Sequence, residues 1–149
     1  MEEERRYHLR MSCTHLGASK DIDKMQVEML NDDSWVVVSL GDPNMSPFKI
    51  FMFSTLLCQN SYLYMNASER ELELESTVAT AEIRSVDFYI KEIVSEFTST
   101  LRAGEPTEGD TSYVCERMIK CPVTRNLESV RKKTTLQLGP HRTFVDSGE

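Results

Sequence analysis

The sequence lacks the features of fibrous, disulfide-stapled and membrane-spanning chains. It holds six Gly, five Pro and four Cys among 149 residues, which excludes a collagen-like chain, a loop-dominated chain and a small disulfide scaffold. The longest apolar stretch, Phe48 to Leu57, is interrupted by Lys49, Ser54 and Thr55. It is far shorter than the roughly 20 residues that a membrane-spanning helix needs. We therefore expect a globular protein with no membrane partner.

The chain also has little positive charge. Its 17 Lys and Arg residues are outnumbered by 24 Asp and Glu residues, so the formal net charge is −7 and the pI is about 5.0. This balance argues against nucleic acid or an anionic membrane surface as the main partner. The charged segment Met1 to Arg6 is followed by no apolar run of the signal-peptide kind. We expect a cytoplasmic protein whose cysteines stay reduced.

The length of 149 residues is typical of one domain, and a second full domain is not expected. A domain of this size buries about 70% of the surface that its unfolded chain exposes, so it folds without a disulfide or a metal ion. We expect the single domain to have its core at about residues 7–138, with residues 139–149 as a loose tail.

Alternation of apolar residues and turn chemistry predict an α+β fold. Segment 86–101 is ambiguous, because its apolar spacing also fits a helix in part, but β-branched and aromatic residues favour a strand. The first three strands are expected to form an antiparallel meander. The expected strands are residues 7–15, 24–30, 34–40, 71–83, 86–101 and 134–138.

A long helix is expected from Pro47 to about Met65. Ser46 can cap its first free N–H groups, and a Pro at the first helical position has no N–H to leave unpaired. Apolar residues surround the axis of this helix, which is typical of a buried helix, and a partner subunit is the natural cover for its outer side. Shorter helices are expected at 111–120 and 122–132, and the basic run 131–133 is interpreted as a charge cluster at a helix end.

Two cysteines occupy informative places in this order of elements. Cys58 lies in the middle of the long helix, eleven residues after Pro47, and Cys121-Pro122-Val123 follows the second helix. With these motifs, nearly the whole chain resembles the OsmC/Ohr family of thiol-dependent hydroperoxide-detoxifying proteins. The resemblance implies an α+β, OsmC-like fold in which antiparallel sheets flank a long buried central helix, and an intertwined homodimer.

The resemblance also implies a reaction. Cys58 would attack an organic hydroperoxide, and Cys121 would resolve the resulting sulfenic acid as a disulfide, which protects the nucleophile from over-oxidation. An external dithiol would reduce the disulfide, and no bound cofactor is expected. Phe48, Phe51 and Met52, together with Phe53, are expected to line an apolar substrate pocket at the dimer interface.

One position departs from the family pattern. Active members carry a Glu ten residues before the nucleophile, which orients an Arg towards the thiolate, whereas this chain has Phe48 there. The first strand offers Arg10, and the following loop offers Lys20 and Lys24. An alternative is therefore a non-catalytic protein that binds an apolar small molecule at the dimer interface. A third hypothesis is slow thiol–disulfide exchange. A cation beside Cys58 would favour the peroxidase.

The remaining candidates favour structural interpretations. Cys13 and Cys115 are expected to be packing residues. Cys115 and Cys121 lack the spacing of metal ligands, so we expect no metal site. His15 is a less favoured candidate for the site, and Arg125 is expected to be a solvated cation.

Overall fold

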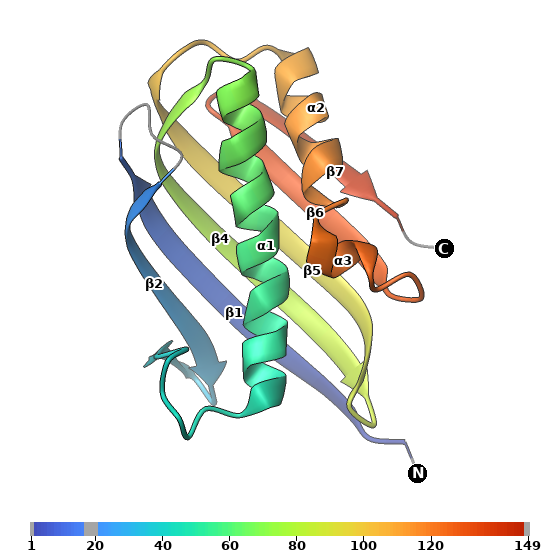
Figure 1. Ribbon diagram of the computed structural model, residues 1–149. Helices are drawn as coiled ribbons and strands as arrows, with labels where there is room; N and C mark the ends of the chain where they lie inside the picture. Colours follow the sequence, from blue (N-terminus) through green and yellow to red (C-terminus); the bar gives the residue numbers. More distant parts are fainter. Residues whose placement is uncertain (1, 17–20, 148–149) are drawn as a thin grey trace.

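The computed structural model describes residues 2–16 and 21–147 of the chain (Figure 1). The elements in chain order are β1 (Glu4–His15), β2 (Ile22–Asn31), β3 (Ser34–Val38), α1 (Pro47–Glu69), β4 (Glu73–Val86), β5 (Tyr89–Ala103), α2 (Glu108–Met118), α3 (Pro122–Arg125), β6 (Arg131–Leu138) and β7 (His141–Asp146).

The strands form one seven-stranded mixed sheet in the order β3-β2-β1-β4-β5-β6-β7. The first three strands make the predicted antiparallel meander, and β5 is a strand as expected. Strand β6 runs parallel to β5, because α2 and α3 form the crossover that a parallel pair needs. The prediction of purely antiparallel sheets is therefore wrong. Within one chain, all three helices lie on one face of the single sheet (Figure 1), so flanking sheets from two subunits stay a prediction.

The core lies between this face of the sheet and the helices. Alternate residues of the strands point inwards, as the period of two requires, and they meet the buried side of α1. The largest fully buried side chains are Leu9, Met11, Met52, Phe53, Leu56, Leu63, Ile83, Ile93, Phe97, Met118, Leu136 and Leu138.

Helix α1 begins as predicted at Pro47, but the predicted cap is not made. Ser46 occupies the N-cap position without a side-chain hydrogen bond; its carbonyl accepts from the backbone N–H of Ile50 at 3.1 Å. The outer side of the helix is open to solvent, with Ile50, Phe51 and Met65 each exposed by 41–42%. One chain therefore covers only one side of this apolar helix. None of the helices that the described residues form is long and apolar enough to cross a membrane.

The C-terminal third differs most from expectation. The predicted helix at 122–132 ends already at Arg125, and the basic run 131–133 opens β6. The predicted loose tail is wrong as well, because His141–Asp146 forms β7 and pairs antiparallel with β6. The turn between these strands contains Gly139 at a φ of 59°, a conformation that glycine adopts at little cost. As a result β6, which contains Lys132, lies between β5 and β7 in the sheet.

Candidate functional site

Cys58 and Cys121 lie beside each other in the structure. Cys58 is in α1 and partly exposed, and its sulfur accepts a hydrogen bond from the backbone N–H of Val123 at 3.5 Å. Val123 belongs to the first turn of α3, directly after Cys121 and Pro122. The two thiols are close enough that Cys121 raises the pKa of Cys58. The fold thus brings together the two cysteines that the sequence singles out.

The Cys-Pro sequence explains the position of Cys121. Proline cannot continue the hydrogen bonding of α2, and it forces the preceding residue into an extended conformation. Cys121 accordingly has φ −61° and ψ 154° and occupies the N-cap position of α3. Its N–H donates to the carbonyl of Met118, and its carbonyl accepts from Arg125. The side chain is fully buried, with 0% exposure.

The environment of Cys58 opposes ionisation. The pKa of this thiol is raised to about 11, chiefly by burial; the N–H of Val123 acts in the opposite direction, and the neighbouring Cys121 contributes to the increase. Among the described residues, no cation contributes to this pKa. A thiol must lose its proton to attack a peroxide, so in one chain Cys58 is mainly in the protonated, unreactive form.

Cys121 has a polar environment instead. The Thr124 hydroxyl donates its hydrogen to the carbonyl of Ile119 at 2.8 Å, so it accepts from the Cys121 thiol, whose sulfur lies 3.1 Å away. The ammonium group of Lys132 donates to the carbonyls of Thr124 at 3.2 Å and Leu127 at 2.7 Å. Lys132 is only 8% exposed. A buried cation, Lys132, therefore lies on the Cys121 side of the cysteine pair, where both residues contact Thr124.

The sequence analysis misses Lys132 because it assigns the basic run to a helix end. Once β6 begins at Arg131, the alternation of the strand places Lys132 on the same side as the buried Thr134, Leu136 and Leu138. Burial lowers the pKa of Lys132, and the charges of Glu128 and Cys121 act in the opposite direction. Had the segment been read as a strand, its alternation would have predicted that Lys132 is buried.

Two of the residues expected to line an apolar pocket border a groove in the single chain. Phe48 and Phe51 line an open groove of about 350 Å³ at the N-terminal end of α1. Met52 does not line it, because the next position along the helix is turned by about 100° and Met52 is fully buried, as is Phe53. The other lining residues are Phe88, Tyr89, Ile90, Lys91, Leu127, Ser129 and Val130.

The groove is bordered by an unusual turn. Asp87 and Phe88 join β4 to β5, and both have positive φ, 50° and 68°. This is the conformation of a type I′ hairpin turn, in which a bulky residue such as Phe is a rare choice. The Phe88 ring is 56% exposed and packs edge-on against Phe48, with the ring centroids 5.8 Å apart. The guanidinium of Arg5 lies 4.9 Å from the centre of the Phe88 ring.

The other two cysteines lie outside this site. Cys115 is fully buried in α2 and donates to the carbonyl of Thr134 at 3.4 Å, and burial raises its pKa to about 12. Cys13 belongs to a buried cluster in which its sulfur lies 3.7 Å from both His15 Nε2 and Asn60 Nδ2. Burial raises the pKa of the Cys13 thiol and lowers that of His15. None of these hydrogen bonds involves Cys58 or Cys121.

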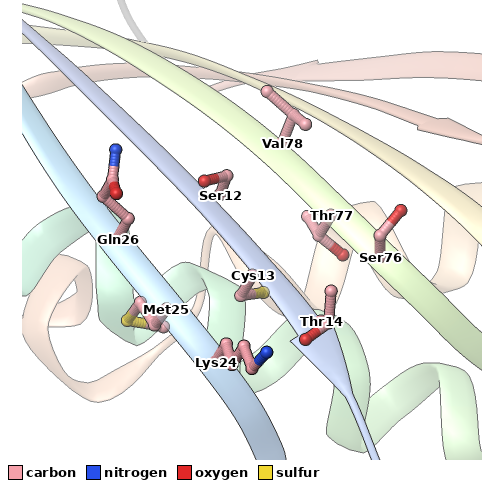
Figure 2. A pocket seen from close by; sticks show the side chains of 9 residues that line it. All are labelled: Ser12, Cys13, Thr14, Lys24, Met25, Gln26, Ser76, Thr77 and Val78. Atoms are coloured by element: carbon pink, nitrogen blue, oxygen red, sulfur yellow. The ribbon is translucent and has the colours of Figure 1, made fainter.

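A hollow of about 310 Å³ lies over the sheet near Cys13 (Figure 2). Its side chains come from three adjacent strands, β1, β2 and β4, and they are Ser12, Cys13, Thr14, Lys24, Met25, Gln26, Ser76, Thr77 and Val78. Neither Cys58 nor Cys121 lines this hollow. In the part of the chain that the structure describes, no group of three or more His, Cys, Asp or Glu side chains could hold a metal ion.

The cations considered for Cys58 are engaged elsewhere or lie outside the described part. Arg10 forms a bidentate pair with Glu28, at 3.0 and 2.7 Å, and its guanidinium lies 4.2 Å from the centre of the Trp35 ring. Lys24 is exposed on β2, and Lys20 lies outside the described residues. Arg125 donates to the backbone carbonyl of Lys120 at 2.7 Å.

Comparison with known proteins identifies the fold. The chain is similar to an OsmC-like hydroperoxide resistance protein from Jannaschia sp. CCS1, with a TM-score of 0.54 and 14% identity over 95% of this chain and 99% of that chain. It is also similar to an OsmC-like protein from Mycoplasma pneumoniae, with a TM-score of 0.53 and 10% identity over 76% of this chain and 88% of that chain. No family model matches the sequence, and no curated protein is significantly similar to it. The chain therefore has the OsmC-like fold.

Proposed function

We propose that the protein is a two-cysteine, thiol-dependent peroxidase that reduces organic hydroperoxides. Cys58 is the nucleophile and Cys121 the resolving thiol. The observation that carries this proposal is the adjacency of the two side chains, with the Val123 N–H on the Cys58 sulfur at 3.5 Å. The OsmC-like fold supports it, because one structural neighbour is described as a hydroperoxide resistance protein.

The proposed reaction has two oxidative steps. The Cys58 thiolate attacks one peroxide oxygen, the O–O bond breaks, and the alkoxide leaves with a proton as an alcohol, so the sulfur becomes a sulfenic acid. The Cys121 thiolate then attacks the sulfenic sulfur, and the hydroxyl group leaves with a proton as water. The product is a disulfide, which an external dithiol reduces. The protein needs no bound cofactor for these steps.

Turnover should be slow. The pKa of about 11 at Cys58 leaves only a small fraction of the thiol ionised at neutral pH. Phe48 occupies the position at which active family members carry the Glu that orients an Arg. A second subunit is one source of a cation for this site.

The working form in this proposal is a homodimer in the cytoplasm. The exposed apolar side chains Ile50, Phe51 and Met65 lie along the outer side of α1, and a second copy of α1 is the natural cover for them. The cytoplasm keeps cysteines reduced between turnovers.

The test is consumption of cumene hydroperoxide with dithiothreitol as reductant. Wild type should turn over slowly but above the rate of free thiol, and Cys58→Ser should abolish turnover. Without dithiothreitol, Cys121→Ser should consume one equivalent to form the sulfenic acid at Cys58 and a second equivalent to form the sulfinic acid. Cys115→Ser is the matched control and should retain turnover. If Cys58→Ser keeps the wild-type rate, Cys58 is not the nucleophile.

A second candidate function is binding of an apolar small molecule, and the groove beside α1 favours it. Its walls include Phe48, Phe51 and Phe88. The backbone of Phe88 has a φ of 68°, and strained backbone of this kind is common at ligand sites. The protein should then bind an apolar fluorescent probe such as 1-anilinonaphthalene-8-sulfonate, and Phe51→Ser should weaken that binding. Val37→Ser removes another exposed apolar side chain, 63% exposed, and should have no effect. Probe binding without turnover above free thiol would favour this function over the peroxidase.

A further inference from the structure

Lys132 is a buried cation that the proposed oxidative reaction does not yet use. Its side chain is 8% exposed, and burying an ammonium group is costly unless neighbouring groups compensate. Two of its three N–H donors are taken by the carbonyls of Thr124 and Leu127, at 3.2 and 2.7 Å. A buried ammonium group at this position therefore suggests a neighbouring group that it stabilises.

Thr124 connects this cation to the resolving cysteine. Its carbonyl accepts from the Lys132 ammonium group, and its hydroxyl oxygen lies 3.1 Å from the Cys121 sulfur. This hydroxyl donates its hydrogen to the carbonyl of Ile119 at 2.8 Å and accepts from the Cys121 thiol. When Cys121 ionises, the hydroxyl can turn its hydrogen towards the sulfur instead. The ammonium group and the sulfur are thus both in contact with one buried residue, Thr124, which is 0% exposed. In such a region, opposite charges interact much more strongly than in water.

We propose that Lys132 stabilises Cys121 as a thiolate and thereby makes Cys121 the leaving group when the disulfide is reduced. This inference rests on the proposed function, because it assigns a role in the same two-cysteine cycle. Lys132 acts through space on the sulfur and does not itself touch the peroxide. Burial lowers the pKa of Lys132, and the charges of Glu128 and Cys121 oppose that shift, which agrees with the geometry.

The exposure of the two sulfurs gives the direction of the reductive step. Cys58 is partly exposed, whereas Cys121 is 0% exposed. A thiolate of the external dithiol therefore attacks the Cys58 sulfur, the S–S bond breaks, and its electron pair leaves on Cys121. The second thiolate of the dithiol then attacks its own sulfur in the mixed disulfide and releases Cys58, which takes up a proton. A better leaving thiolate speeds the first of these attacks.

The segments around Cys121 carry other titratable groups. The segment between α2 and α3 carries Lys120, and α3 carries Arg125, which binds the Lys120 carbonyl. Glu128 is exposed beyond α3. On α1 the facing titratable group is Cys58 itself. Among these groups, Lys132 is the buried cation.

The first test measures the thiolate fraction of Cys121 directly. In a Cys58→Ser protein labelled with ¹³C at cysteine Cβ, the Cys121 resonance is followed by NMR from neutral to alkaline pH. Lys132→Met should lower the thiolate fraction at a given pH by roughly tenfold. Lys132→Gln should act in the same direction while it retains donors for the carbonyls. Lys133→Met is the matched control, because the Lys133 ammonium lies 4.9 Å from the Phe144 ring centre, and it should leave the titration unchanged.

A reciprocal test needs no change at Lys132 and so avoids a folding defect in its variants. The ¹³Cε resonance of Lys132 is titrated in the Cys58→Ser protein and in the Cys58→Ser/Cys121→Ser protein. Loss of the Cys121 thiolate should move the Lys132 titration to lower pH, since linkage between two sites is reciprocal. An unchanged Lys132 titration, or an unchanged Cys121 titration in folded Lys132 variants, would overturn the inference. Neither measurement uses peroxide, so its outcome is independent of whether the peroxidase proposal holds.

Discussion

The backbone N–H of Val123 donates a hydrogen bond to the sulfur of Cys58 at 3.5 Å, although the two residues are 65 positions apart in the chain. This contact fixes the first turn of α3 against the middle of α1. It thereby holds Cys121 next to Cys58. Among the described residues, this bond is the one interaction at Cys58 that favours the thiolate, since a hydrogen bond to the charged form lowers the pKa.

The reactivity of Cys58 should depend strongly on pH. With a pKa of about 11, its rate of alkylation by iodoacetamide should rise roughly tenfold per pH unit up to about pH 10. Because Cys121 raises this pKa, Cys121→Ser should shift the profile to lower pH. Mass spectrometry of the Cys58 peptide gives the rates. A plateau already near pH 8 would mean that a cation, for example from a second subunit, lies beside Cys58.

The outer side of α1 should form a subunit interface. We expect a homodimer that buries more than about 2,000 Å² in total. Met65→Glu and Ile50→Glu place a charge on this side and should shift the protein towards monomer in sedimentation equilibrium. Val37→Glu alters an exposed apolar residue of β3 and serves as the control. A stable, folded wild-type monomer at micromolar concentration would contradict the dimer.

The turn at Phe88 should show backbone strain. Phe88→Gly and Phe88→Ala both remove the ring, so their difference reports the cost of the φ of 68°. Glycine adopts this conformation freely, whereas alanine does not. The Gly variant should therefore have a free energy of unfolding about 1 kcal/mol higher than the Ala variant. Urea denaturation measures the difference, and equal stabilities would show that the turn is not strained.

Cys115 should make the fold sensitive to alkaline pH. Its pKa is about 12 in the folded protein, above the ordinary value of 9.0, so folding favours the protonated thiol. The contribution to stability is complete below pH 9 and is lost between pH 9 and 12, by about 1.4 kcal/mol per pH unit.

The matched comparison uses two buried residues of α2. Cys115→Ala should flatten the decline of the free energy of unfolding above pH 9. Val114→Ala removes a buried side chain without a thiol and should lower stability while it leaves the pH dependence intact. If both variants keep the wild-type slope, Cys115 is not responsible for it.

Local patterns sufficed for the first two thirds of the chain. The alternation in the strands and the Ser46-Pro47 signal predict the meander, α1 and the long hairpin of β4 and β5. The placement of Cys58 and Cys121 in one site depends on α3 meeting α1, which no local pattern contains. It could be predicted only through the resemblance to a known family.

The errors have a common physical origin in the C-terminal third. The basic run 131–133 resembles a helix end locally, yet the pairing of β6 with β5 and β7 makes it a strand and turns Lys132 inwards. Met52 was assigned to the pocket because α1 is apolar on every side, so composition alone does not show which side faces the sheet. In both places, contacts distant in sequence decide the outcome.

The central claim is that Cys58 and Cys121 form one redox pair, and peptide mapping after mild oxidation tests it most directly. The reduced protein is treated with one molar equivalent of cumene hydroperoxide, the remaining thiols are blocked, and the disulfide-linked peptides are identified by mass spectrometry. The account predicts an intrachain disulfide between Cys58 and Cys121, with Cys13 and Cys115 recovered as blocked thiols. A disulfide that involves Cys13 or Cys115, or no disulfide at all, would contradict it.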